Sequence, residues 1–266
     1  MKSLLLYICC FSFVFAGAQT IPQNDTIPVP PGSIISSDNL ENLFIVTPTN
    51  DIIKYDKDGK KTATANFKVL GDITSIDVTN PFEIYVFYRD QNKIIFLDNL
   101  LNIRGECDME SIGVSQIACI GRSADNQIWL FDVADLKLKK YSKDLKLIIE
   151  SASFNTFNIG ADVYPTIIKD INTSVFILNQ NKVLEFDIFA NFSKIKLIDT
   201  LQNFQFINEK IVFLKKNKIY MFNPLNFMMQ EFTVSLPANT KNIRIEKERL
   251  YVLTDEYVIL QTFTEK

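Results

Sequence analysis

Short apolar runs alternate with polar turns along most of the chain, and a second kind of segment follows each run. This second segment begins with a polar residue and continues with apolar and aromatic residues, and most copies end on Asp, Asn or Ser. The copies occupy residues 51–56, 93–98, 137–142, 182–187, 218–223 and, as a weaker match, 257–262. Their starts are 42, 44, 45, 36 and 39 residues apart. A spacing of about forty residues is typical of a repeat that forms one small sheet.

The apolar runs that precede these segments also repeat, and they are rich in β-branched and aromatic residues. They cover residues 43–46, 84–87, 128–131, 175–178, 211–214 and 250–253. A continuous apolar run of this length predicts a strand that is buried on both faces. Polar turns join each run to the segment that follows it, so each pair is expected to form a hairpin.

One repeat can be followed through four strands, at residues 73–78, 83–88, 93–98 and 103–107. Tight hairpins between them predict an antiparallel meander. One such sheet cannot bury both of its faces, but a ring of sheets around an axis can. The sequence therefore predicts an all-β fold, a six-bladed β-propeller of four-stranded antiparallel blades. Five or seven blades, a β-sandwich, or two small β domains remain open alternatives.

The last repeat ends after its third strand, near Phe263. The N-terminal segment 19–32 contains residues 25–30, which can supply the missing outer strand and close the ring. Its prolines are compatible with an edge strand, which is the place that this segment would take. The propeller domain is then expected to span residues 33–266.

The first residues have the pattern of a secretory signal peptide. Lys2 gives a positive start, residues 4–15 are apolar, and Ala16 and Ala18 are small residues at a cleavage site. We expect residues 1–18 to be removed, since the apolar run is short for a transmembrane anchor. No later stretch is apolar and long enough to span a bilayer, so the mature chain is expected to lack a transmembrane segment. The protein is therefore expected to be exported to the periplasm.

The composition excludes several classes of chemistry. The chain has no histidine, so Ser–His–Asp and Cys–His catalysis and zinc sites that require His are excluded. Lys and Arg number 28 against 31 Asp and Glu, a net charge of −3. A mildly acidic chain without long basic runs argues against nucleic acid as a partner.

With these repeats in place, the chain resembles six-bladed β-propellers of the NHL and TolB-like type, on degenerate patterns such as residues 182–187. It lacks the Trp-Asp dipeptide of WD40 repeats, since Leu130 follows Trp129, and has only eight glycines where NHL repeats have glycine-rich turns. The resemblance implies an architecture and carries no site residues with it.

The ending of the signal peptide and the Asn, Lys, Ile and Phe-rich composition resemble exported proteins of Bacteroidota. Asp25-Thr26-Ile27 and Asp199-Thr200-Leu201 resemble the O-glycosylation sequon of that phylum. This resemblance implies Thr26 and Thr200 as candidate O-glycosylation sites.

Two motifs invite a chemical interpretation. Residues 56–60 begin like a calcium loop, but Lys60 and Phe67 stand where further oxygen ligands are needed, so a tight turn with Gly59 at positive φ is preferred. Cys107 and Cys119 fall on an outer and an inner strand, too far apart for a disulfide, and are expected to be free. We therefore predict no metal-binding residue and no cofactor.

Acidic residues occur near the inner strands and in the last repeat, at Asp77, Asp125, Asp170, Glu246, Glu248 and Asp255. No pair has a spacing that singles it out for acid–base catalysis, so no catalytic residue is predicted. The candidate interface lies instead in two apolar loop segments, with Phe154, Phe157, Phe227, Met228 and Met229 as the residues expected to contact a partner.

These observations favour a non-enzymatic periplasmic propeller that binds proteins. It would act as a scaffold or accessory subunit of an outer-membrane assembly, export or secretion complex, with peripheral membrane association through its partners. Its nearest functional likeness is the propeller subunit of the outer-membrane β-barrel assembly machinery. Two alternatives are a glycan- or peptide-binding propeller and a carboxylate-dependent lyase or hydrolase.

Overall fold

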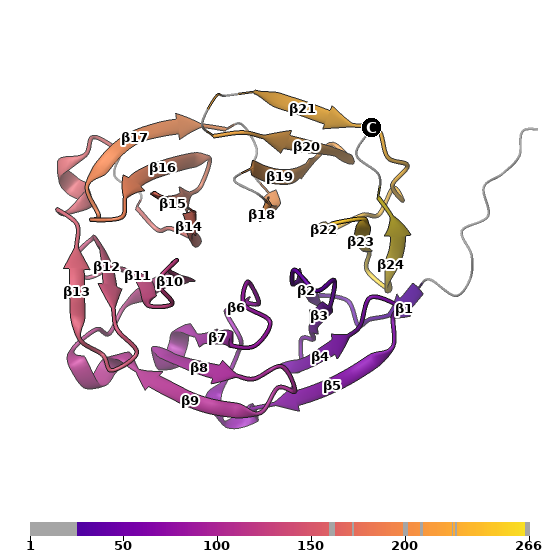
Figure 1. The fold of residues 1–266 in the computed structure, drawn as a ribbon, viewed down its shortest axis with the longest axis horizontal. Coiled ribbons are helices and arrows are strands. Elements are labelled where there is room, and N and C mark those ends of the chain that lie inside the picture. The colour runs from indigo at the N-terminus through magenta and orange to yellow at the C-terminus, as the bar shows by residue number, and fades with distance from the viewer. Residues whose placement is uncertain are drawn as a thin grey trace, which may run out of the picture.

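The computed structural model describes residues 26–159, 163–171, 173–198, 202–207, 210–224, 226 and 228–263. Within them, twenty-four strands form six antiparallel sheets of four strands each, and the sheets surround a central axis (Figure 1). The predicted six-bladed β-propeller is confirmed, and the sandwich and two-domain alternatives are wrong. The expected signal peptide lies outside the described residues.

The first three blades run from the inner strand to the outer strand in chain order. They comprise β2 (Ile34–Ser37), β3 (Leu43–Val46), β4 (Asp51–Tyr55) and β5 (Lys61–Asn66); β6 (Ser75–Asp77), β7 (Ile84–Tyr88), β8 (Lys93–Leu97) and β9 (Ile103–Asp108); and β10 (Ile117–Arg122), β11 (Ile128–Asp132), β12 (Lys137–Tyr141) and β13 (Leu147–Glu150).

The fourth and fifth blades repeat this order, and the sixth takes its outer strand from the start of the described chain. They comprise β14 (Ile167–Ile171), β15 (Ser174–Asn179), β16 (Lys182–Asp187) and β17 (Phe192–Leu197); β18 (Gln202–Ile207), β19 (Lys210–Lys215), β20 (Lys218–Phe222) and β21 (Met229–Phe232); and β22 (Asn242–Glu246), β23 (Arg249–Leu253), β24 (Tyr257–Thr262) and β1 (Thr26–Pro28). Four short 3-10 helices lie between strands: η1 (Lys68–Leu70), η2 (Arg89–Gln91), η3 (Met109–Ile112) and η4 (Phe154–Thr156).

The ring closes through β1, which pairs antiparallel with β24. Ile27 stands opposite Val258, and the backbone N–H of Val29 donates to the Glu256 carbonyl at 2.9 Å. The side chains of Ile27 and Val29 are buried against the first and sixth blades, with Ile35 and Leu260. The two ends of the described chain therefore share one sheet, and the otherwise open edge of β24 is covered.

The core consists of the layers between neighbouring blades. All five side chains of β7 are buried, because both faces of this strand contact other blades. Val46 and Ile52 of the first blade, for example, share a cluster with Val86 and Ile95 of the second. This packing explains why the second strand of each blade is a continuous apolar run.

An aspartate-based turn recurs between the third and fourth strands. Oδ1 of Asp56 accepts hydrogen bonds from the N–H groups of Asp58 and Lys60, and Asp98 and Asp187 make the same pair of bonds. Gly59 has φ of 76°, which confirms the predicted turn at residues 56–60. A Cβ at Gly59 would lie 3.3 Å from Leu260 of the closing blade, so glycine fits both the backbone angle and the tight packing.

Candidate functional site

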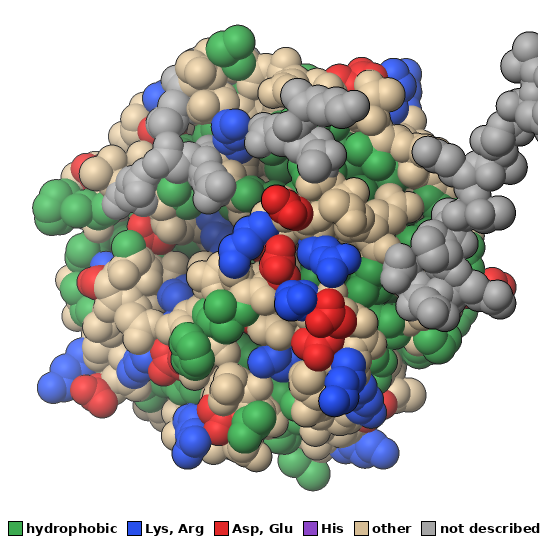
Figure 2. Space-filling model, turned by 45° about the vertical axis from the view of Figure 1, so that its right-hand side comes forward, with side chains coloured by type: hydrophobic (Ala, Val, Ile, Leu, Met, Phe, Trp, Pro, Cys, Tyr) green, Lys and Arg blue, Asp and Glu red, His purple; other side chains and the backbone are tan. Residues whose placement is uncertain are grey.

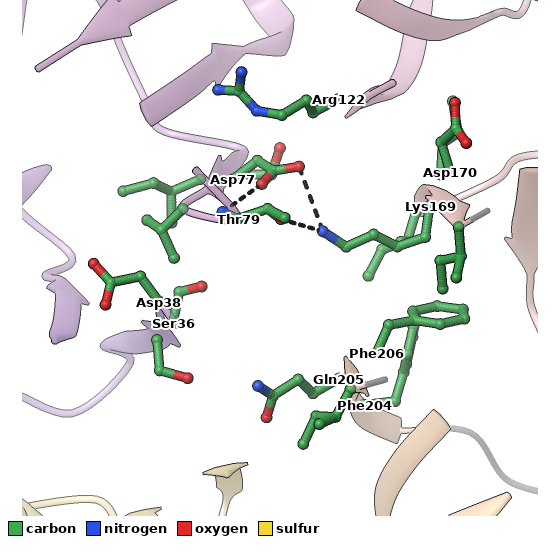
Figure 3. Close-up of a pocket in the computed structure, with 18 of the residues that line it drawn as sticks. Ser36, Asp38, Asp77, Thr79, Arg122, Lys169, Asp170, Phe204, Gln205 and Phe206 are labelled. Atoms are coloured by element: carbon green, nitrogen blue, oxygen red, sulfur yellow. Dashed lines mark hydrogen bonds and ion pairs between the residues drawn. The ribbon is translucent and has the colours of Figure 1, made fainter. Parts of the chain in front are cut away.

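The inner strands of the six blades line an axial cavity of about 760 Å³. Its walls combine charged groups with hydroxyls and with apolar side chains such as Val78, Ile120 and Phe206. Figure 3 shows lining residues that come from different blades, with Lys169 reaching across to Asp77 and Thr79. A cavity of this size matches the space that small organic ligands occupy in proteins.

An ion pair crosses one side of this cavity. Nζ of Lys169 on β14 lies 3.5 Å from Oδ2 of Asp77 on β6, and donates to Oγ1 of Thr79 at 2.5 Å (Figure 3). Burial of Asp77 opposes ionisation, but the Lys169 charge and the hydrogen bonds from Thr79 outweigh it and lower the pKa of Asp77 to about 2. Asp77 is therefore a carboxylate at neutral pH and already has its partner.

Arg122 is held in a similar way between the second and third blades. Its guanidinium lies 2.8 Å from a carboxylate oxygen of Glu83 and stacks on the ring of Tyr85, 3.8 Å from the centroid. The ammonium of Lys143 contacts the other Glu83 oxygen at 2.6 Å. This cluster fixes one blade to the next, with one carboxylate shared between two basic groups.

Asp170 at the end of β14 joins the third and fourth blades. Its Oδ2 accepts hydrogen bonds from the indole N–H of Trp129 at 2.9 Å and from the backbone N–H of Ala124 at 3.1 Å. Its Oδ1 is buried and has no hydrogen-bond partner in the described structure.

The wall of the sixth blade, across the ring from β10, is formed by Arg244 and Glu246. They are two residues apart on β22, so their side chains lie on the same face of this strand. Oε1 of Glu246 accepts from Oγ of Ser37 at 3.1 Å and from Nε2 of Gln205 at 2.8 Å. Burial raises the pKa of Glu246 to about 7, and burial lowers the pKa of Arg244 to about 10. Both groups line the cavity, and neither has a described ion-pair partner within 4.0 Å.

Three of the acidic residues noted in the sequence, Asp77, Asp170 and Glu246, thus line the cavity. Asp125 pairs instead with Lys140 at 2.8 Å, and Asp255 with Lys241 at 3.2 Å. Glu248 is exposed in the turn after β22 and does not line the cavity.

Sequence reasoning did not select the basic residues of the cavity, Arg122, Lys169 and Arg244. A signal was present, because each is a basic residue in a strand with isoleucines: Arg122 ends β10, Lys169 follows two isoleucines in β14, and Arg244 lies between two isoleucines in β22.

The predicted interface residues differ in how exposed they are in the structure. Phe154 is 1% exposed and packs against Phe131 and Phe186 in the core, so its assignment as a contact surface is wrong. Phe157 is half-buried and stacks on Phe192. Phe227 lies outside the described residues. Met228 and Met229 are exposed, and their role remains a prediction.

The other candidates are placed as follows. Thr26 is exposed on β1, whereas Thr200 lies outside the described residues. Cys107 and Cys119 are free and buried, and burial raises the pKa of both thiols. The described residues contain no group of three or more acidic or Cys side chains placed to hold a metal ion. Nor does any helix among them have the length and apolar character needed to cross a membrane.

One face of the disc exposes large apolar side chains at the tips of its turns. In a meander the connections alternate between two faces, so the first-to-second and third-to-fourth strand turns share one face. Leu40, Phe82, Leu100, Phe189 and Met228 lie in such turns and are between 49% and 70% exposed. We call the surface defined by these five residues the tip face. Figure 2 shows basic and acidic side chains interspersed over the part of the molecule in view.

Comparison with known proteins agrees with the fold. No family model matches the chain, and no curated protein matches it. Among solved structures, virginiamycin B lyase from Staphylococcus aureus has a TM-score of 0.58 at 14% identity, over 91% of this chain and 97% of that one. The Neurospora crassa Pan2 WD40 domain has a TM-score of 0.60 at 11% identity, over 89% and 92% of the two chains. The extracellular domain of BT4673 from B. thetaiotaomicron has a TM-score of 0.54 at 11% identity, over 88% of this chain and 34% of that one.

These similarities define the class of protein as a β-propeller. Because every identity is below 25%, they show the fold alone. They include an enzyme and a WD40 domain, and the shared fold therefore does not decide between catalysis and binding.

Proposed function

We propose that this protein is a non-enzymatic, exported β-propeller that binds other proteins, as a scaffold or accessory subunit of an outer-membrane assembly, export or secretion complex. The observation that carries the proposal is the tip face, where four of the blades expose a large apolar side chain at a turn. Single exposed apolar side chains are common on protein surfaces, but their recurrence at the turns of one face supports a contact surface there.

The architecture supports such a role. Each blade is anchored to the next by buried contacts, and the pairing of β1 with β24 closes the ring. A rigid partner loses less conformational entropy on binding than a flexible one, so more of the contact energy remains as affinity. Most ionic groups around the axis, including Asp77 and Arg122, are occupied in holding blades together.

The test compares the wild-type protein with a variant of the tip face. Phe82→Ser, Leu100→Ser and Phe189→Ser would be combined, and Val69→Ser on the other face would serve as the control, because Val69 is 93% exposed. Tagged proteins would be cross-linked in cells and purified from the envelope in mild detergent. A stoichiometric partner is expected with wild type and Val69→Ser, and its loss is expected with the triple variant. A wild-type protein that always elutes alone would refute the proposal.

The proposed location and origin are tested separately. Export after removal of residues 1–18 predicts a mature protein that begins at Gln19 and fractionates with the periplasm or outer membrane. We further propose that the protein belongs to the NHL and TolB-like propellers of Bacteroidota, in which Thr26 would carry an O-linked glycan. Intact mass measurement of the native and Thr26→Ala proteins checks both the processing and the modification.

A further inference from the structure

Arg244 is a charged group that the described part of the protein leaves largely uncompensated. Its Nη1 donates to Oδ1 of Asn242 at 2.9 Å and to the carbonyl of Ile243 at 2.8 Å. Both acceptors are neutral, and no described carboxylate lies within ion-pair distance of the guanidinium. Burial lowers the pKa of Arg244, yet at about 10 it stays protonated at neutral pH. A guanidinium has five N–H donors, so several remain for another partner.

The contrast with the other basic groups of the cavity is informative. Arg122 has the carboxylate of Glu83, and Lys169 has the carboxylate of Asp77. Charged side chains that lie away from water are normally paired. Arg244 is half-buried in the same cavity and has no ion-pair partner among the described carboxylates.

Glu246 compensates for Arg244 only in part, through the attraction between their charges. The two share a face of β22, but they form no ion pair, and Oε1 of Glu246 is already bound by Ser37 and Gln205. With its pKa raised to about 7, a large fraction of Glu246 is uncharged near neutral pH. A protonated carboxyl group can donate a hydrogen bond to an acceptor in the cavity, and it does not repel an anion.

The other lining residues offer hydroxyl groups and apolar surface to the uncharged part of an organic ligand. Ser36 and Ser75 line the cavity with hydroxyls that have no hydrogen-bond partner among the described residues. Val78, Phe204 and Phe206 add apolar surface. A volume of about 760 Å³ accommodates a ligand of the size of a short peptide or a sugar acid.

We propose that the axial cavity binds a small organic carboxylate, whose oxygens accept hydrogen bonds from the N–H groups of Arg244 that the described residues leave unused. Guanidinium and carboxylate groups match in geometry and charge, and their hydrogen bonds are stronger than those between neutral groups. This site goes beyond the protein-binding role, because none of the five residues of the tip face lines the cavity.

The experiment uses pairs of probes that differ only in the acid. N-acetyl-trialanine is compared with its C-terminal amide, and D-glucuronate with D-glucose, by titration calorimetry of the full-length protein. At least one acid is expected to bind about tenfold more tightly than its neutral counterpart. The peptide and sugar arms identify the source of the carboxylate. If neither acid binds better than its counterpart at millimolar concentration, the proposal is overturned.

Variants then locate the site. Arg244→Gln is expected to abolish the preference for the acid, and Arg244→Lys to retain part of it, since an ammonium keeps the charge but loses the planar pair of donors. Arg249→Gln is the matched control, because Arg249 belongs to the same blade, pairs with Asp58 and does not line the cavity. Thermal unfolding verifies that each variant folds. Unchanged acid binding by a folded Arg244→Gln protein would overturn the assignment, whatever the outcome of the tip-face experiment.

Discussion

The indole Nε1 of Trp129 on β11 donates a 2.9 Å hydrogen bond to Oδ2 of Asp170 on β14 and so joins the third blade to the fourth. The backbone N–H of Ala124, in the turn between β10 and β11, donates to the same oxygen at 3.1 Å. A carboxylate at the end of one inner strand thus organises two elements of the preceding blade. Hydrogen bonds of this kind hold one sheet of the ring to the next.

Replacing Asp170 by Ala is expected to destabilise the protein by about 1–3 kcal/mol, because it leaves the donors of Trp129 and Ala124 without their acceptor. Trp129 is the only tryptophan in the chain, so its fluorescence reports on this junction during urea unfolding. Asp144→Ala is the control, since Asp144 lies in an exposed turn. An equal effect of both substitutions would show that the junction contributes nothing specific.

The third and fourth blades also approach each other closely at Gly121. A Cβ at this position would lie 2.5 Å from the backbone oxygen of Ile168, which cannot move without shifting β14. Gly121→Ala is therefore expected to lower stability by about 1–3 kcal/mol. Gly105→Ala is the comparison, because its Cβ would meet Phe96 at an ordinary 3.6 Å. Thermal unfolding should show a lower midpoint for the first substitution and an unchanged or higher one for the second.

The closing strand can be tested with two neighbouring positions. Ile27 on β1 is buried between the first and sixth blades, whereas Thr26 is exposed. Ile27→Asp would place a charge in this apolar layer and is expected to cost about 3 kcal/mol or more. Thr26→Asp should change stability by less than about 0.5 kcal/mol. If both variants unfold at the same urea concentration, the pairing of β1 with β24 contributes little to closure.

The strands that sequence reasoning located well are those buried on both faces. The second strand of each blade, such as β7, is a continuous apolar run because blades lie on either side of it. The inner strands were harder to delimit. Residues 73–78 were expected to form one, but β6 spans only Ser75–Asp77, because this strand borders the polar cavity and lacks a clear apolar pattern.

The site was less predictable, since it depends on which blades meet. Asp77 and Lys169 are 92 positions apart, and nothing local indicates that they pair. Arg244 and Glu246 could have been recognised as a pair, because alternate residues of a strand share a face. Phe154 was misjudged as exposed since it lies in a long connection. That connection folds back between two blades and stacks Phe154 on Phe186.

The protonation of Glu246 gives a prediction about pH. Burial is the main reason that its pKa rises from 4.5 to about 7. The neighbouring charge of Asp38 raises it further, while Ser37, Gln205 and Arg244 act in the opposite direction. Between pH 4.5 and 7 the folded protein then binds more protons here than the unfolded chain does. The contribution of this group to stability therefore falls as the pH rises through that window.

Glu246→Gln removes the titration and keeps the shape of the side chain. The variant is expected to match wild type near pH 4.5, where the carboxyl group is mostly protonated in the folded protein. It should be more stable than wild type at pH 8, where folded wild type must hold a poorly solvated carboxylate. Unfolding midpoints measured from pH 4.5 to 8.5 check this, with Glu248→Gln as an exposed control. Parallel curves for wild type and Glu246→Gln would mean that Glu246 ionises in the folded protein as it does in the unfolded chain.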